Sequence, residues 1–243
     1  MLSLELRAED PEFYARSHIE LPFGEIRVWP VGQPISTVGD PRIFGTRFLD
    51  VGLVHGEFSR QLVTQAAAIP ANIRSFGGKK VRDLETWNMP AARLLTLRAL
   101  LMFCRVYGVQ SAHVVDRWAN VMQQHEYSAP HCHYESEAAV VYFLDAGDPT
   151  PERSPSGRFE LIDSRIPFCC TSREYRPTRG LMPELTPGMM LLFPAEFLHH
   201  VHPYEGRRPR ITLAWNLSSG VGEPRDPELL ARQNPGKFGI TTA

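Results

Sequence analysis

The sequence predicts a mainly β fold, a sandwich or barrel supported by helices. The segment before Gly108 carries two helical patterns, whereas the segment after it carries short runs rich in Val, Leu and aromatic residues, bounded by Pro, Gly and Asp. A block of helices followed by a block of short strands is typical of this class. With 243 residues, of which 43% are hydrophobic, the chain is long enough to bury a core without disulfides.

The first half is expected to supply strands and turns, followed by two helices. Residues 19–56 contain short apolar runs that prolines and a glycine interrupt. One helix is predicted over about 57–68, where a proline ends the pattern, and a second over about 88–107, which a proline opens and a glycine closes. In the second helix Arg98 and Arg105 lie on one stripe, so the remaining surface can be buried as a buttress of the fold.

The second half is expected to supply the strands. They are residues 113–122, 138–144, 159–163, 189–193 and 211–217. In the last of these, large apolar residues alternate with Thr212, Ala214 and Asn216, the period of a strand with two different faces. Residues 218–243 are polar, and we expect an external tail with one short helix near 228–232.

Charge and composition bear on partners and location. The chain carries 26 Lys and Arg against 27 Asp and Glu, so it has no basic field of the kind that binds nucleic acid or anionic membranes. Its first residues are charged where a signal peptide is apolar, and its four cysteines show no Cys-x-x-Cys spacing. We therefore expect a cytoplasmic protein with reduced thiols and a small-molecule or peptide partner. The oligomeric state stays open.

Five of the nine histidines fall in two clusters. In the first cluster, an extended backbone would place His131, His133 and Glu135 on one face, because alternate side chains of a strand share a face. Two imidazoles and a carboxylate suit Fe(II), Mn(II) or Zn(II). This spacing predicts a metal site.

The second cluster follows the strand at 189–193. His200 and His202 share one face and His199 takes the other, so spacing alone leaves open which of them reaches a metal. Arg210 and Thr212 then share a face of the following strand. An arginine fork grips a planar carboxylate and a hydroxyl adds a donor, so we expect a carboxylate clamp in the same cavity as the metal.

Five segments carry a resemblance to a known family. They read W-x-N-V, P-H-x-H-x-x-S with V-Y-F-L, G-R-F-E-L-I-D-S-R, P-G-M-M-L-L-F-P-x-x-x-x-H and R-I-T-L-A-W-N, in this order. Over about Trp118 to Leu217 the chain resembles the Fe(II)/2-oxoglutarate-dependent oxygenases, and most of all a group of bacterial and phage enzymes with H-x-H, F-P-x-x-x-x-H and R-I-S/T motifs. The resemblance implies one domain with a double-stranded β-helix core, the cupin-like jelly roll. That core would span residues 113–217, with supporting strands and helices in 1–112 and a tail in 218–243.

The resemblance also implies a metal set. The first metal histidine of the family falls on His131 and the distal one on His199. The family's usual acid, two residues after the first histidine, is His133 in this chain. The third ligand is therefore His133 itself, Glu135 or water.

The cosubstrate residues follow in the same way. Arg210 matches the residue that binds the far carboxylate of 2-oxoglutarate, and Thr212 matches the hydroxyl beside it. The segment P-H-C also resembles the start of the aspartyl/asparaginyl β-hydroxylase motif, and that alignment places Asn120 and Tyr142 at positions that touch the cosubstrate. The second tyrosine of the bacterial and phage group is Phe143, which removes one hydroxyl contact.

The activity that the resemblance implies uses Fe(II), dioxygen and 2-oxoglutarate. It would release succinate and carbon dioxide and hydroxylate a small molecule or an amino-acid or peptide side chain. Two alternatives stay open: a cupin-like dioxygenase or isomerase that needs no 2-oxoglutarate, and a metal or 2-oxoglutarate sensor without turnover. Arg210 discriminates, because a cupin-like enzyme gives that side chain no necessary partner.

The segment 145–187 holds six arginines and has two interpretations. It is either a solvated surface insertion or a lid that offers positive charge to an acidic substrate.

Overall fold

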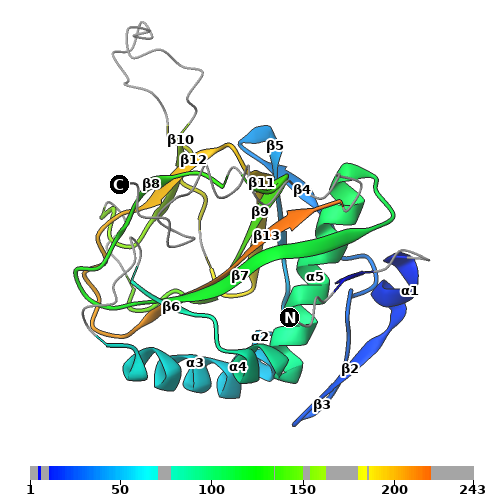
Figure 1. The fold of residues 1–243 in the computed structure, drawn as a ribbon, viewed down its shortest axis with the longest axis horizontal. Helices are drawn as coiled ribbons and strands as arrows, with labels where there is room; N and C mark the ends of the chain where they lie inside the picture. Colours follow the sequence, from blue (N-terminus) through cyan, green and yellow to red (C-terminus); the bar gives the residue numbers. More distant parts are fainter. Residues whose placement is uncertain are drawn as a thin grey trace, which may run out of the picture.

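The computed structural model describes residues 5–6, 11–70, 78–133, 135–149, 154–162, 180–184 and 186–219. Its largest element is an antiparallel sheet in the order β1-β7-β13-β9-β11-β5-β4, with β6 added to β7 (Figure 1). These strands are β1 (Glu5–Leu6), β4 (Ser36–Val38), β5 (Asp40–Arg47), β6 (Lys79–Val81), β7 (Ala112–Met122), β9 (Ala138–Asp145), β11 (Met189–Pro194) and β13 (Arg210–Ser218). We call this the large sheet.

A small sheet of three strands packs against one face of the large sheet. It has the order β10-β12-β8, and its strands are β10 (Phe159–Ile162), β12 (Leu198–Val201) and β8 (Ser128–His131). Phe159 and Leu161 of β10 join Val141 and Phe143 of β9 in one apolar cluster between the two sheets. A separate hairpin pairs β2 (His18–Leu21) with β3 (Gly24–Arg27).

Helices cover the other face of the large sheet. Figure 1 shows α3, α4 and α5 gathered away from the small sheet. The helices are α1 (Pro11–Arg16), α2 (Val51–Val54), α3 (Gly56–Ala68), α4 (Leu84–Asn88) and α5 (Pro90–Tyr107). Buried side chains of α3 and α5 pack with alternate residues of β7, β9, β11 and β13 in the main core. This arrangement confirms the mainly β fold with a helical buttress.

Helix α5 ends where its sequence predicts but begins two residues later than predicted. Pro90 fills its first turn, and Gly108 ends it with a left-handed backbone at φ 66°. The predicted helix over 88–107 is wrong at its start, because Met89 is extended and separates α4 from α5. A residue before proline is biased away from helical geometry, which explains the break.

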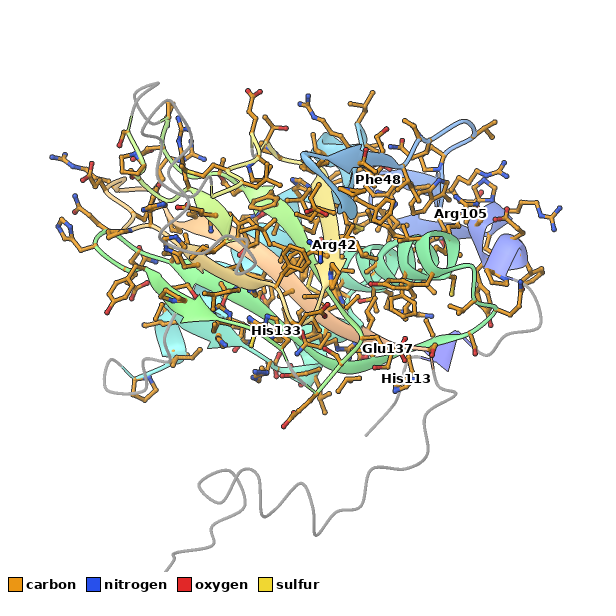
Figure 2. All side chains as sticks on the ribbon, turned by 90° about the horizontal axis from the view of Figure 1, so that it is seen from above. Arg42, Phe48, Arg105, His113, His133 and Glu137 are labelled. Atoms are coloured by element: carbon orange, nitrogen blue, oxygen red, sulfur yellow. The ribbon has the colours of Figure 1, made fainter. Side chains whose placement is uncertain are left out.

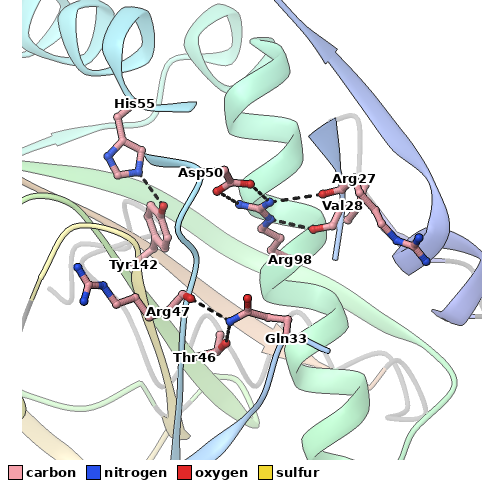
Figure 3. Close-up of polar contacts among 9 residues, drawn as sticks. All are labelled: Arg27, Val28, Gln33, Thr46, Arg47, Asp50, His55, Arg98 and Tyr142. Atoms are coloured by element: carbon pink, nitrogen blue, oxygen red, sulfur yellow. Dashed lines mark hydrogen bonds and ion pairs between the residues drawn. The ribbon is translucent and has the colours of Figure 1, made fainter. Parts of the chain in front are cut away.

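The two arginines of α5 lie in different environments. Arg105 is near the surface and pairs with Glu12 at 2.7 Å. Arg98 is fully buried: Nη1 donates to Asp50 Oδ1 at 2.9 Å, Nε donates to the Val28 carbonyl at 2.8 Å, and Nη2 pairs with the second carboxylate oxygen (Figure 3). The two arginines that the sequence places on one stripe therefore differ: Arg105 lies near the surface and Arg98 is buried. Figure 2 shows Phe48 beside α5, the helix that carries Arg105, with His133 well apart from both labelled residues.

The strand predictions agree with the structure at all five positions, within one residue of the observed ends where these are described. The predicted helix over 57–68 is confirmed as α3. The expected helix near 228–232 and most of the arginine-rich segment lie outside the described residues. Among the described helices, none combines the length and apolar character that a membrane span needs. The domain boundaries and the cytoplasmic location stay predictions from the sequence.

Candidate active site

Three histidines from neighbouring strands converge on one point. His131 ends β8 and is paired in register with His199 of β12. His133 follows two residues after β8, where its backbone N–H donates to the Ala195 carbonyl at 2.7 Å. One ring nitrogen from each of the three lies within 4.8 Å of the others, and the Nε2 atoms of His133 and His199 are 3.3 Å apart. The spacing left the choice in the second cluster open; the structure brings His199 to the first cluster.

Hydrogen bonds to the backbone orient two of these rings. His131 Nδ1 lies 2.7 Å from the Ala129 carbonyl, and His199 Nδ1 lies 2.9 Å from the Phe197 carbonyl. A carbonyl oxygen only accepts, so each Nδ1 carries the hydrogen and donates it. The lone pair of each neutral ring is therefore on Nε2, which faces the point of convergence. This is the arrangement by which proteins prepare histidines for a metal.

Burial keeps the three rings neutral. Desolvation lowers the pKa of His131 below its ordinary value of 6.5, and it lowers the pKa values of His133 and His199 to about 3. A neutral imidazole is the form that binds a metal ion, so the group is ready to bind over a wide pH range. Among the described residues, Glu135 is not part of this convergent group.

The histidines open onto a cavity between the two sheets. Its walls include Trp118 and Asn120 of β7, and Arg210 and Thr212 of β13. Asn120 and Thr212 are cross-strand partners, and all four residues stand on the face of the large sheet that looks toward the small sheet. The predicted carboxylate clamp and the predicted metal ligands thus share one cavity.

Arg210 is a buried cation with unused donors. Its side chain is 3% exposed, and neither Nη1 nor Nη2 has a hydrogen-bond partner among the described residues. Burial lowers its pKa to about 10, which still leaves it charged at neutral pH. A buried charge without a partner is costly. Its environment therefore fits an anion bound in the cavity, with the Thr212 hydroxyl two residues along the strand.

The structure places Tyr142 away from the site that the sequence predicts. Its hydroxyl lies 2.7 Å from Nε2 of His55, among the side chains that pack under the helices (Figure 3). Side chains of a strand alternate between faces, so it is Val141 and Phe143 that face the small sheet. The Arg210 guanidinium lies 5.7 Å from the Phe143 ring centroid. Tyr142 therefore faces the helical core and is not among the residues that line the cavity.

Lys80 is a cavity residue that the sequence analysis missed. It lies on β6, which pairs with β7, and its ammonium is 4.7 Å from the Trp118 ring centroid. Its charge helps to lower the pKa values of His131 and His133. The short strand β6 has no periodic pattern of its own, so no local signal placed this lysine beside the histidines.

A family comparison bears on the chemistry of this cavity. Residues 116–216 match a family model described as "Putative 2OG-Fe(II) oxygenase". This match supports the 2OG-Fe(II) oxygenase superfamily for the core that carries the cavity. No curated protein matches the chain.

Solved structures agree with the oxygenase fold. The chain is similar to EctD from S. alaskensis with bound Fe, at 14% identity over 88% of each chain and a TM-score of 0.55. It is similar to the non-heme alpha ketoglutarate dependent epimerase SnoN, at 14% identity over 76% of this chain and 87% of that one, with a TM-score of 0.54. It is also similar to AviO1 from Streptomyces viridochromogenes Tue57, at 12% identity over 74% and 91%, with a TM-score of 0.52. These solved structures confirm the double-stranded β-helix core.

The pair of His55 and Tyr142 gives the protein a testable pH dependence. Burial lowers the pKa of His55 to about 4, below its ordinary 6.5. Between these pH values His55 is protonated in the unfolded chain but neutral in the folded chain. Its contribution to the stability of the fold is therefore complete above pH 6.5 and is lost as the pH falls toward 4. As the pH falls from 6.5 toward 4, the free energy of unfolding measured with urea should decrease less steeply in His55→Gln than in the wild-type protein. The difference in slope should be up to about 1.4 kcal/mol per pH unit. Equal slopes in the two proteins would contradict this assignment.

Proposed function

We propose that this protein is an Fe(II)- and 2-oxoglutarate-dependent hydroxylase whose metal and cosubstrate sites lie in the cavity described above. The observation that carries the proposal is the buried Arg210 in the cavity that three convergent histidines line, because both terminal nitrogens of its guanidinium lack a hydrogen-bond partner among the described residues. The family match of residues 116–216 supports the same chemistry. Its substrate would be a small molecule or an amino-acid or peptide side chain.

His131, His133 and His199 would hold the iron. Their Nε2 atoms fit a metal because two rings are oriented by backbone carbonyls and all three are kept neutral by burial. Three protein ligands on one side of an ion leave other positions open for small ligands. When bound, iron supplies the oxidation that converts 2-oxoglutarate and dioxygen to succinate and carbon dioxide and hydroxylates the substrate.

Arg210 and Thr212 would bind the cosubstrate carboxylate that is farther from the metal. A guanidinium presents two parallel donors to a carboxylate, and the low dielectric of a buried site strengthens that pairing. The Asn120 side chain stands opposite Thr212 on β7 and offers a further polar contact. These residues would orient the cosubstrate, while Trp118 and Phe159 wall the cavity with aromatic rings and limit the entry of water.

Hydroxylation is the outcome we favour among the oxidations that this cavity supports. A structure similar to this chain was solved with 2-oxoglutarate and 5-hydroxyectoine, at 14% identity and a TM-score of 0.53, whereas SnoN is an epimerase. A cupin-like enzyme without 2-oxoglutarate is the second candidate, and a sensor without turnover is the third. No specific contact favours either alternative, and a cupin-like enzyme without 2-oxoglutarate would give the buried charge of Arg210 no anion to bind.

The third ligand is tested by a pair of substitutions. His133→Ala should weaken Fe(II) binding by about 10-fold to 100-fold or more, because it removes one of the convergent nitrogens. Glu135→Gln, two residues away, should leave the affinity unchanged. Anaerobic calorimetry of the folded variants measures both constants. The opposite pattern would assign the ligand to Glu135.

The cosubstrate site is tested at Arg210. Arg210→Gln should raise the KM for 2-oxoglutarate about 100-fold, because truncation of a buried charged partner costs several kcal/mol. Arg208→Gln is the matched control, since Arg208 lies on the same strand connection with a side chain that is 62% exposed and pairs with Asp145. An unchanged KM in folded Arg210→Gln would sink the proposal.

A further inference from the structure

Glu160, His200 and His202 form a second convergent group, on the face of the small sheet turned away from the cavity. Glu160 of β10 is the cross-strand partner of His200 in β12, and His202 follows two residues later on the same face. Oε2 of Glu160 lies 3.0 Å from Nε2 of His200 and 2.7 Å from Nε2 of His202. One ligand atom of each residue lies within 4.8 Å of the others.

The neighbouring backbone leaves room for this carboxylate. A Cβ atom on Gly180 would lie 1.5 Å from Oε1 of Glu160, so a side chain at that position would displace the carboxylate. The next residue, Leu181, is fixed by two backbone hydrogen bonds with Leu161, at 2.8 and 2.9 Å. The carboxylate of Glu160 thus lies between β12 and the backbone of Gly180, which has no side chain to displace it.

The chemistry of the three side chains suits a transition-metal ion. Two imidazoles and one carboxylate are a donor set that Zn(II) and other divalent first-row metals accept. The three side chains are between 17% and 24% exposed, so an ion reaches them from solvent while the protein holds one side of it. We propose that Glu160, His200 and His202 bind a second divalent metal ion of the Zn(II) type, separate from the site at His131, His133 and His199.

The position of this second site gives it a structural consequence. Glu160 lies on β10, His200 lies on β12 and His202 directly follows β12, so a bound ion would link the two strands across their pairing. His199, on the opposite face of β12, lines the catalytic cavity. An ion that binds only the folded chain stabilises it. Zinc is therefore expected to raise the thermal unfolding temperature by holding the strand that carries His199.

Zinc titration separates the two sites. In a metal-free chain with His131→Ala and His199→Ala, calorimetry with ZnCl₂ should give one bound ion per chain. Addition of Glu160→Gln and His202→Gln should weaken that binding at least about 100-fold. The matched control is His18→Gln, an exposed histidine on β2 outside both groups, which should leave binding unchanged.

The proposal is overturned if the chain without His131 and His199 binds no zinc, or binds it equally well after the changes at Glu160 and His202. If loss of the cavity histidines unfolds the protein, the wild-type chain decides: it should bind two ions, and Glu160→Gln with His202→Gln should bind one. Equal stoichiometry in these two proteins would also overturn the second site. The Arg210 experiment is independent of these outcomes.

Discussion

The central strands β9, β11 and β13 of the large sheet are buried on both faces, and this constraint fixes where the site residues of β13 lie. On β13, Ile211, Leu213 and Trp215 enter the helical core, so Arg210 and Thr212 must face the small sheet. The core side is held firmly: the Trp215 indole N–H donates to the Thr96 hydroxyl of α5 at 3.1 Å, and its ring packs edge-on against Trp87. A one-residue slip would bury the Arg210 charge beneath the helices. Packing against α5 thereby keeps the guanidinium in the cavity.

The strand β12 also directs its side chains to two different faces. His199 lies 4% exposed in the cavity, whereas His200 and His202 turn to the other face and meet Glu160. Adjacent residues of one short strand thus supply ligand atoms to two groups. Because a strand is stiff, the two groups are mechanically connected, and whatever orders one face of β12 orders the other.

Sequence reasoning predicted the elements whose signals are local. The strands at 113–122 and 211–217, and the helix that Gly108 ends, follow from periodicity and from residues that break it. The convergence of His131 and His133 followed from alternation, as did the shared face of Arg210 and Thr212, and the family resemblance singled out His199.

The missed features depend on contacts between distant parts of the chain. Arg98 is buried because Asp50 and the Val28 carbonyl, far away in sequence, satisfy its donors. Lys80 reaches the cavity only because β6 pairs with β7. The family alignment placed Tyr142 at the cosubstrate, but the alternation of side chains along β9 turns Tyr142 away from the cavity. The partner of its hydroxyl, His55, lies on a distant part of the chain.

The central claim is that the cavity turns over 2-oxoglutarate with iron and oxygen. The most direct measurement is succinate released when metal-free protein is mixed anaerobically with Fe(II) and 2-oxoglutarate and then exposed to oxygen. We expect succinate release that requires all three components and that is lost in Arg210→Gln at low 2-oxoglutarate. A folded wild-type chain that binds Fe(II) and 2-oxoglutarate but releases no succinate would contradict it.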